Sequence, residues 1–158
     1  MMRVRSWYGL EAEIDVEEEV WHRVRVDGVP LNHPPLVNLV LRQGLSSTER
    51  HRLSFLHEFG HFQTLPLAIV HSLVLYRASP KPVSFLRKII WWLTFAVTHQ
   101  VFWEIASEGY VVAHEREDYM RAYRQKPNLL MLIFWGVMGG VGFWLHLWLV
   151  HKSDQGAS

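Results

Sequence analysis

Three long apolar segments constrain the fold of this chain more than any other feature. They are Leu53–Tyr76, Val83–Trp103 and Leu129–Val150. The third is the clearest, because Leu129–Leu145 carries no charged residue. About 20 apolar residues in a helix cross the hydrocarbon core of a bilayer. We therefore expect a mainly α membrane protein with about three transmembrane or membrane-embedded helices.

Two features of these segments bear on how the helices pack. Pro66 lies inside the first segment and predicts a kink near Phe62. Gly136 and Gly140 lie four residues apart in the third segment, with Gly139 and Gly142 alongside, as close packing of helices in lipid requires. Small residues are also common in membrane helices without that role. The second segment is expected to continue as a polar helix through Glu104–Arg124.

The amino-terminal part of the chain has the pattern of β structure. Three short runs are rich in β-branched and aromatic residues: Arg3–Tyr8, Leu10–Val16 and Val20–Val26. Asp27 and Gly28 follow the third run, and this dipeptide is typical of tight hairpin turns. We expect a small N-terminal β-hairpin region of two or three strands over residues 1–45, beside a membrane-embedded helical core over residues 46–158.

The composition excludes several classes of function. Sixteen Lys and Arg against fifteen Asp and Glu leave a net charge of +1, so no global field attracts nucleic acid. The absence of cysteine excludes thiolate zinc sites and a cysteine nucleophile. The ten histidines instead point to metal binding or to proton transfer.

The motif that carries chemistry is His57-Glu58-Phe59-Gly60-His61. Residues i and i+4 share one face of a helix, so His57 and His61 can bind one Zn²⁺ ion. Glu58 lies about 100° around the helix from His57, where it can act as general base toward a zinc-bound water. This is the HExxH arrangement of metalloproteases. The alternative is that both histidines are interfacial residues bonded to their neighbours.

The third zinc ligand follows from the register of a helical hairpin. If the first two apolar helices run antiparallel around a turn near Ser79–Pro82, residues at equal distances from the turn lie side by side. Glu104 then lies opposite Phe59, between the two histidines, and is the predicted ligand. Glu108 lies one turn farther along the same face and is predicted to accept a hydrogen bond from one of the two histidines.

These two motifs resemble those of the gluzincin metallopeptidases, in particular the membrane-embedded HtpX and CAAX prenyl protease group. The resemblance rests on the HExxH motif followed by Glu104-Ile105-Ala106-Ser107-Glu108, and it covers roughly residues 45–115. It implies that the two histidines and Glu104 bind zinc, that Glu58 is the general base and that Glu108 orients a ligand. The second motif has Glu and Ser where Asp and Ala are usual, and the chain is much shorter, so it resembles a minimal member.

Other residues are candidates for contacts with a substrate. His99, about one turn from the zinc ligands, and His114, beyond Glu108, could each stabilise the oxyanion, although a lone histidine on a helix is more often a packing residue. Val24–Val26 is a candidate edge strand that pairs with the backbone of an extended substrate, or else it only covers the core.

Together these features predict a membrane-embedded zinc endopeptidase that cleaves a peptide or a membrane protein at the bilayer interface. Seven basic residues flank the expected active-site side of the membrane and five flank the other side, which favours a cytosolic active site. The alternative is a non-hydrolytic membrane metal protein, such as a metal transporter, a di-metal oxygenase or an inactive scaffold. Assembly into a homo-oligomer is compatible with the sequence.

Overall fold

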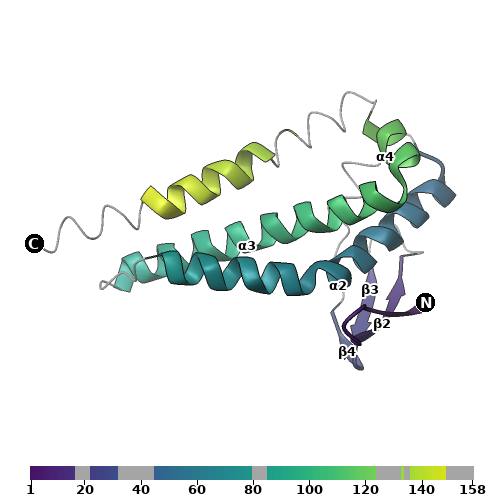
Figure 1. Cartoon of the computed structure of the whole chain (residues 1–158), viewed down its shortest axis with the longest axis horizontal. Coiled ribbons are helices and arrows are strands. Elements are labelled where there is room, and N and C mark those ends of the chain that lie inside the picture. Colours follow the sequence, from purple (N-terminus) through teal and green to yellow (C-terminus); the bar gives the residue numbers. More distant parts are fainter. Residues whose placement is uncertain (17–21, 32–44, 80–84, 124–132, 134–135, 149–158) are drawn as a thin grey trace, which may run out of the picture.

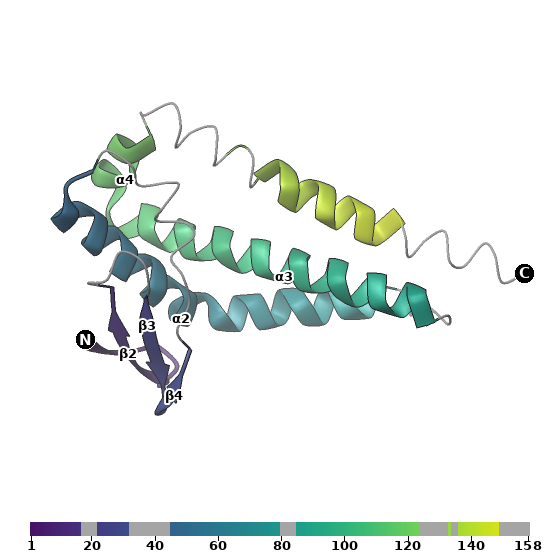
Figure 2. The same cartoon turned by 180° about the vertical axis from the view of Figure 1, so that it is seen from behind.

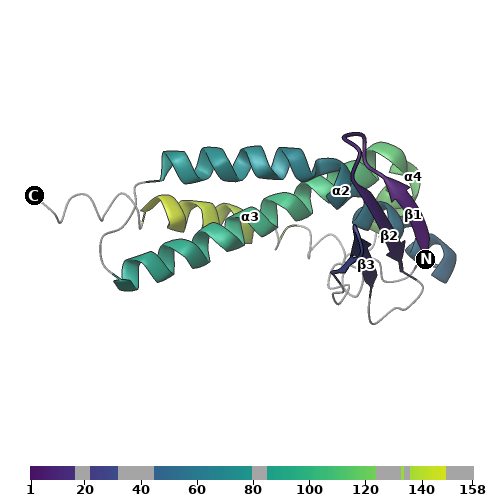
Figure 3. The ribbon, with the colours of Figure 1, turned by 90° about the horizontal axis from the view of Figure 1, so that it is seen from below.

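The computed structural model describes residues 1–16, 22–31, 45–79, 85–123, 133 and 136–148. Their elements are β1 (Met2–Arg5), β2 (Glu11–Asp15), β3 (Arg23–Val26), β4 (Val29–Pro30), α2 (Ser47–Ala78), α3 (Phe85–His114) and α4 (Arg116–Tyr123). Residues 136–148 form a further helical segment. The long helices α2 and α3 run antiparallel side by side, and the sheet and α4 lie at the same end of this pair (Figures 1 and 3).

The sheet has four antiparallel strands in the order β1-β2-β3-β4, rather than the two or three strands that we expected. Asp27 and Gly28 have φ values of 46° and 82°, so the predicted hairpin turn is confirmed. The chain continues past that turn far enough for Pro30 to pair with Arg25. A proline is accommodated there because an edge strand does not need every backbone N–H.

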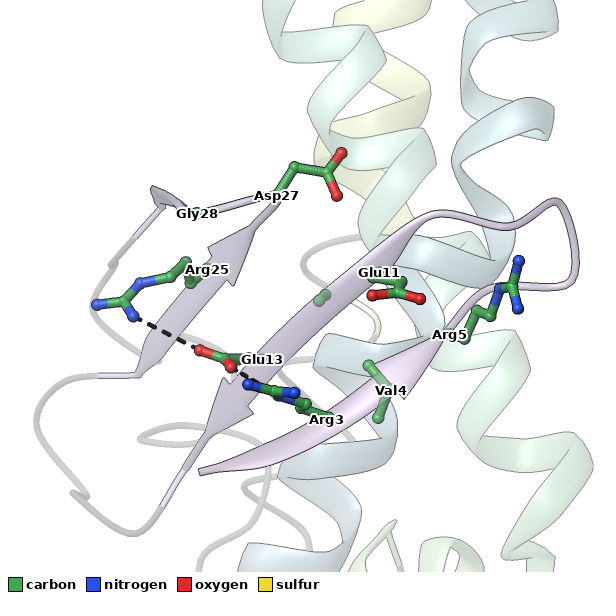
Figure 4. Close-up of a pocket in the computed structure, with 9 residues that line it drawn as sticks. Arg3, Val4, Arg5, Glu11, Glu13, Arg25, Asp27 and Gly28 are labelled. Atoms are coloured by element: carbon green, nitrogen blue, oxygen red, sulfur yellow. Dashed lines mark hydrogen bonds and ion pairs between the residues drawn. The ribbon is translucent and has the colours of Figure 1, made fainter.

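The two faces of the sheet differ in polarity. Ala12 and Ile14 of β2 are buried and form a core with aromatic residues of α2, among them Phe62. The outer face carries a ladder in which Glu13 bonds Arg3 at 3.0 Å and Arg25 at 3.5 Å (Figure 4). The hollow on this outer face is lined by charges of both signs and contains no histidine.

The amino-terminal end of α2 packs against α4. Ser46 caps α2 in a capping box with Glu49, and Leu53 lies in a core cluster with Val111 and Tyr119. The prediction of one continuous helix through Arg124 is wrong, because α3 ends at His114 and α4 begins at Arg116. The break allows Tyr119 of α4 to pack onto α2.

Pro66 lies inside α2, and two aromatic side chains bond the backbone in the turn before it. A proline lacks the N–H that would bond the carbonyl four residues earlier, so it leaves the carbonyl of Phe62 without its helical donor. Tyr8 donates its hydroxyl to this carbonyl at 2.5 Å, and the Trp7 indole donates to the carbonyl of Gln63 at 3.0 Å. The ribbon of α2 changes direction along its length (Figure 1). The turn between β1 and β2 therefore supports the kink that the sequence predicts.

Residues 136–148 pack against α3 through glycines (Figure 2). A Cβ atom at Gly139 would lie 2.5 Å from the side chain of Val101, and one at Gly142 would lie 3.8 Å from Val97. A Cβ at Gly136 or at Gly140 would meet nothing within 4 Å. Of the four glycines named from the sequence, Gly139 and Gly142 therefore lie on the packing face, whereas Gly136 and Gly140 do not.

The prediction of a membrane protein is wrong. Within the part of the chain that the structure describes, no helix is both long and apolar enough to cross a bilayer. Polar side chains interrupt the apolar run of α2 at Glu58 and Gln63 and that of α3 at Gln100 and Glu104. The predicted integral-membrane location and the predicted orientation of the active site depended on membrane-spanning helices, so they are wrong as well.

Candidate metal centre

A cluster of three metal-binding side chains lies where α2 and α3 run side by side. His57 and His61 lie one turn apart on α2, and Glu104 reaches them from α3. Their candidate donor atoms all lie within 4.8 Å of one another, and this group could hold a metal ion. We call these residues the three-donor cluster.

The distances in the cluster suit a small four-coordinate ion. The Nε2 atoms of His57 and His61 are 3.1 Å apart, and Oε2 of Glu104 lies 3.1 Å from the first and 3.6 Å from the second. Metal–ligand bonds of about 2.0–2.1 Å in a tetrahedron place neighbouring ligands about 3.3 Å apart. The three donor atoms thus fit three corners of a tetrahedron and leave the fourth for another ligand.

The three residues of the cluster differ in burial. His57 is 4% exposed, whereas the side chain of Glu104 is 31% exposed. Burial alone would raise the pKa of Glu104, but hydrogen bonds and charge from the two imidazoles hold that pKa well below its usual range. Glu104 is therefore an ionised oxygen donor whose Oε2 atom is buried against the two histidines, while the rest of its side chain is partly exposed.

Glu108 orients one of the two imidazoles. Its Oε1 lies 2.6 Å from Nδ1 of His57, and its side chain is buried. An ionised carboxylate can only accept, so Nδ1 of His57 donates and Nε2 keeps its lone pair toward the cluster.

The indole of Trp103 packs beside His61 at 4.9 Å between ring centroids and donates to the His61 carbonyl at 3.0 Å.

A glycine sets how closely the two ligand-bearing helices approach. A Cβ atom on Gly60 would lie 2.8 Å from Oγ and 2.9 Å from the carbonyl oxygen of Ser107. The Ser107 hydroxyl donates to the carbonyl of His57, which ties the helices together at this point. This close contact lies beside Glu104 and the histidines, so Gly60 and Ser107 help to set the spacing of the cluster, a role that sequence reasoning did not single out. A glycine inside a helix three residues after a ligand was the available signal.

Glu58 is held by a residue of the amino-terminal sheet region. Its Oε1 lies 2.7 Å from Nδ1 of His22, and the two residues are 3% and 2% exposed. The sequence carries no local signal that could pair His22 with a helix residue 36 positions later.

The other candidates lie apart from the cluster. His99 bonds Ser72 at 2.5 Å, and His114 bonds the carbonyl of Tyr110 in its own helix at 2.8 Å. Neither belongs to the three-donor cluster. Val24–Val26 is not an edge strand, because β3 pairs with β2 on one side and with β4 on the other.

A second group of histidines lies in the far part of the helix pair. His146, which is fully buried, bonds Ser79 at 2.7 Å and Thr94 at 2.8 Å. His71 stacks on Phe102 with ring centroids 3.9 Å apart. Burial lowers the pKa of His99 and of His146, and burial together with the charge of His99 lowers the pKa of His71. Hydroxyl groups and aromatic rings surround these histidines.

Comparison of the chain with protein-family models, with curated proteins and with solved structures finds no match.

Proposed function

We propose that this chain is a zinc-dependent peptidase of minimal gluzincin type. The observation that carries the proposal is the approach of His57 Nε2, His61 Nε2 and Glu104 Oε2 to within 3.1–3.6 Å of one another. Two imidazoles and one carboxylate are the protein ligands of several catalytic zinc sites, in which the fourth position holds water.

The remaining acidic residues suit two separate roles in hydrolysis. A zinc ion at the cluster would supply a polarised water and an electrophile for the scissile carbonyl. Glu58 takes a proton from the attacking water and transfers it to the leaving amine as the carbon–nitrogen bond breaks. Glu108 keeps His57 in the tautomer that presents Nε2 to the ion. The substrate class that this chemistry favours is a peptide.

A second candidate is a metal-binding protein without hydrolytic activity. The observation in its favour is that Glu58 is 3% exposed and already bonded to His22, as in a scaffold that kept the motif for structure. A di-metal oxygenase is disfavoured, because the described part of the chain contains a single group of three metal-binding side chains. Metal content and peptide cleavage together distinguish the two candidates.

The experiment combines metal analysis with one conservative variant. The purified full-length chain is expected to contain one zinc per chain and to cleave peptides from a mixed-sequence library. Glu58→Gln is expected to keep the zinc and to lower kcat by about 10²–10⁴-fold, because the amide cannot take a proton. Glu117→Gln, an exposed change in α4, is the matched control and should leave both properties unchanged.

Two results would contradict the peptidase proposal. A wild-type chain that holds zinc but cleaves no peptide would leave the non-hydrolytic metal protein. Cleavage that persists unchanged in Glu58→Gln would remove Glu58 from the chemistry, and a contaminating peptidase would then have to be excluded with a zinc-free His57→Ala preparation.

A further inference from the structure

The amino-terminal sheet is anchored to the same helix that carries the HExxH motif. Its inner face shares a core with Phe62 and packs against Phe55 and Phe59 of α2. Trp7 and Tyr8 bond the carbonyls of Gln63 and Phe62. The sheet therefore contacts α2 on both sides of His61, and its position relative to the motif is fixed by packing and by hydrogen bonds.

His22 extends this anchoring to the side chain of Glu58. It lies just before β3 (Arg23–Val26), and its Nδ1 is 2.7 Å from Oε1 of Glu58. Both residues are almost completely buried, so water does not compete for this contact. An ionised carboxylate has no proton to donate, so the imidazole is the donor.

A buried carboxylate with a fixed donor has far fewer orientations than one in water. A general base works only when its oxygen lies within hydrogen-bond reach of the proton that it takes, so a small error in orientation is costly. Glu108 performs the corresponding task for the ligand His57, whereas His22 acts on Glu58. The two contacts fix different parts of the same site.

We propose that His22 is a positioning residue that orients the carboxylate of Glu58, so that the amino-terminal sheet region is part of the catalytic apparatus. This inference rests on the proposed peptidase function for its effect on the rate. The hydrogen bond between His22 and Glu58 does not require bound zinc. The positioning role and the peptidase function can therefore be tested in separate experiments.

The first experiment compares two substitutions at the same position in the full-length, zinc-loaded chain. His22→Leu removes the donor and should lower kcat by about 10- to 100-fold. This is the usual range for a residue that orients another residue in direct contact with the reacting groups. The KM and the zinc content should stay at wild-type values. His22→Asn places an amide N–H at the same distance from the backbone as Nδ1, and it should restore most of the lost kcat.

A matched control separates positioning from a general loss of a buried histidine. His146 is fully buried and hydrogen-bonded in the far part of the helix pair, away from the three-donor cluster. His146→Leu should lower stability while leaving the kcat of the folded fraction unchanged. In a Glu58→Gln background, His22→Leu should have no further effect on kcat, because the group that it positions is already inactive.

A second experiment does not depend on activity. A double-mutant cycle of His22→Leu and Glu58→Gln, measured by urea unfolding of the metal-free chain, should be non-additive because the residues touch. In ¹H–¹⁵N spectra, the ring of His22 should carry its proton on Nδ1 and should shift in Glu58→Gln.

The outcomes separate this inference from the peptidase proposal. An unchanged kcat in His22→Leu, or a loss that His22→Asn does not restore, would overturn the positioning role, and so would loss of zinc in His22→Leu. If the wild type binds zinc but cleaves no peptide, the peptidase proposal fails by itself. The unfolding cycle then decides whether His22 holds Glu58, and additive free energies would overturn the contact.

Discussion

Histidines occur in two regions along the α2–α3 pair, one near the sheet and one where residues 136–148 join the pair, and the two regions give them different partners. Near the sheet, His57 and His61 face carboxylates from α3, namely Glu104 and Glu108. In the far region, the partners of His146 are the hydroxyls of Ser79 and Thr94. His99 similarly bonds a hydroxyl, that of Ser72.

This difference shows that the presence of nearby carboxylates, rather than of histidines, determines whether a region can bind a metal ion. A buried imidazole without a nearby carboxylate is disfavoured in its charged form, and burial accordingly lowers the pKa of His99 and His146. Such a residue serves as a neutral hydrogen-bonding group in packing. Negative charge beside paired imidazoles stabilises a bound cation. We therefore expect metal in the region near the sheet and none in the far region.

The largest expected effect is on metal binding. A structural zinc ion contributes an apparent binding free energy of about 10–16 kcal/mol, so each of its ligands accounts for roughly 3 kcal/mol, or more than about 100-fold in affinity. His57→Ala and Glu104→Ala should each abolish stoichiometric zinc, measured by elemental analysis after dialysis. His146→Ala should keep one zinc per chain. Zinc that is retained in His57→Ala and lost in His146→Ala would reverse the comparison.

The next effect tests the close approach of the helices. In Gly60→Ala the new methyl group would overlap the Ser107 carbonyl, whose backbone cannot move away easily. We expect a loss of about 1–3 kcal/mol in unfolding free energy, measured with urea, and weaker zinc binding. Gly109→Ala in α3 is the matched control, because a Cβ there meets nothing within 4 Å. It should be neutral or stabilising. Equal losses in both variants would show that the helices do not need this contact.

A smaller effect concerns the orientation of the ligand. Glu108→Ala removes the acceptor for Nδ1 of His57 and should weaken zinc binding by about 10- to 100-fold. The measurement is competition with a chelator of known affinity. Wild-type affinity in this variant would mean that the imidazole is held by packing alone.

The hydrogen bond from Tyr8 to α2 should have a smaller effect, which is on the unfolding free energy. Tyr8→Phe removes the hydroxyl that bonds the carbonyl of Phe62 and should lower the unfolding free energy by about 1 kcal/mol. In a Pro66→Ala background the same change should cost less, because the alanine N–H can bond that carbonyl. Equal costs in both backgrounds would separate Tyr8 from the effect of Pro66.

The smallest effect is a pH dependence from the far region. Burial lowers the pKa of His146 in the folded chain below the value of about 6.5 that it has when unfolded. Between these two values the unfolded chain binds more protons, so stability falls as pH decreases below about 6.5. His146→Gln should reduce this slope in urea unfolding followed from pH 8 to pH 5. An unchanged slope would assign the pH dependence to other groups.

The three-donor cluster follows from local rules that the sequence displays. The i, i+4 spacing of His57 and His61 indicates a shared helix face, and counting from a hairpin turn nominates Glu104. Both steps use only helix geometry, which varies little between proteins. The Asp27-Gly28 turn was predictable for the same reason, because few dipeptides adopt positive φ at both positions.

The rest depended on contacts that no local pattern encodes. The pairing of His22 with Glu58 and the bonds from Trp7 and Tyr8 to α2 all depend on where the sheet packs. The membrane prediction failed because long apolar stretches were counted as spans despite the polar residues within them, such as Gln63. Hydropathy averaged over a segment does not reveal that its polar side chains form a buried cluster.

The most direct test of the three-donor cluster is a crystal structure of the zinc-loaded chain with anomalous data collected on both sides of the zinc edge. We predict one anomalous peak bonded to His57 Nε2, His61 Nε2 and a Glu104 carboxylate oxygen at about 2.0–2.2 Å. No peak should occur near His71, His99 or His146. A zinc ion bound elsewhere, or a cluster that stays empty at saturating zinc, would contradict the account.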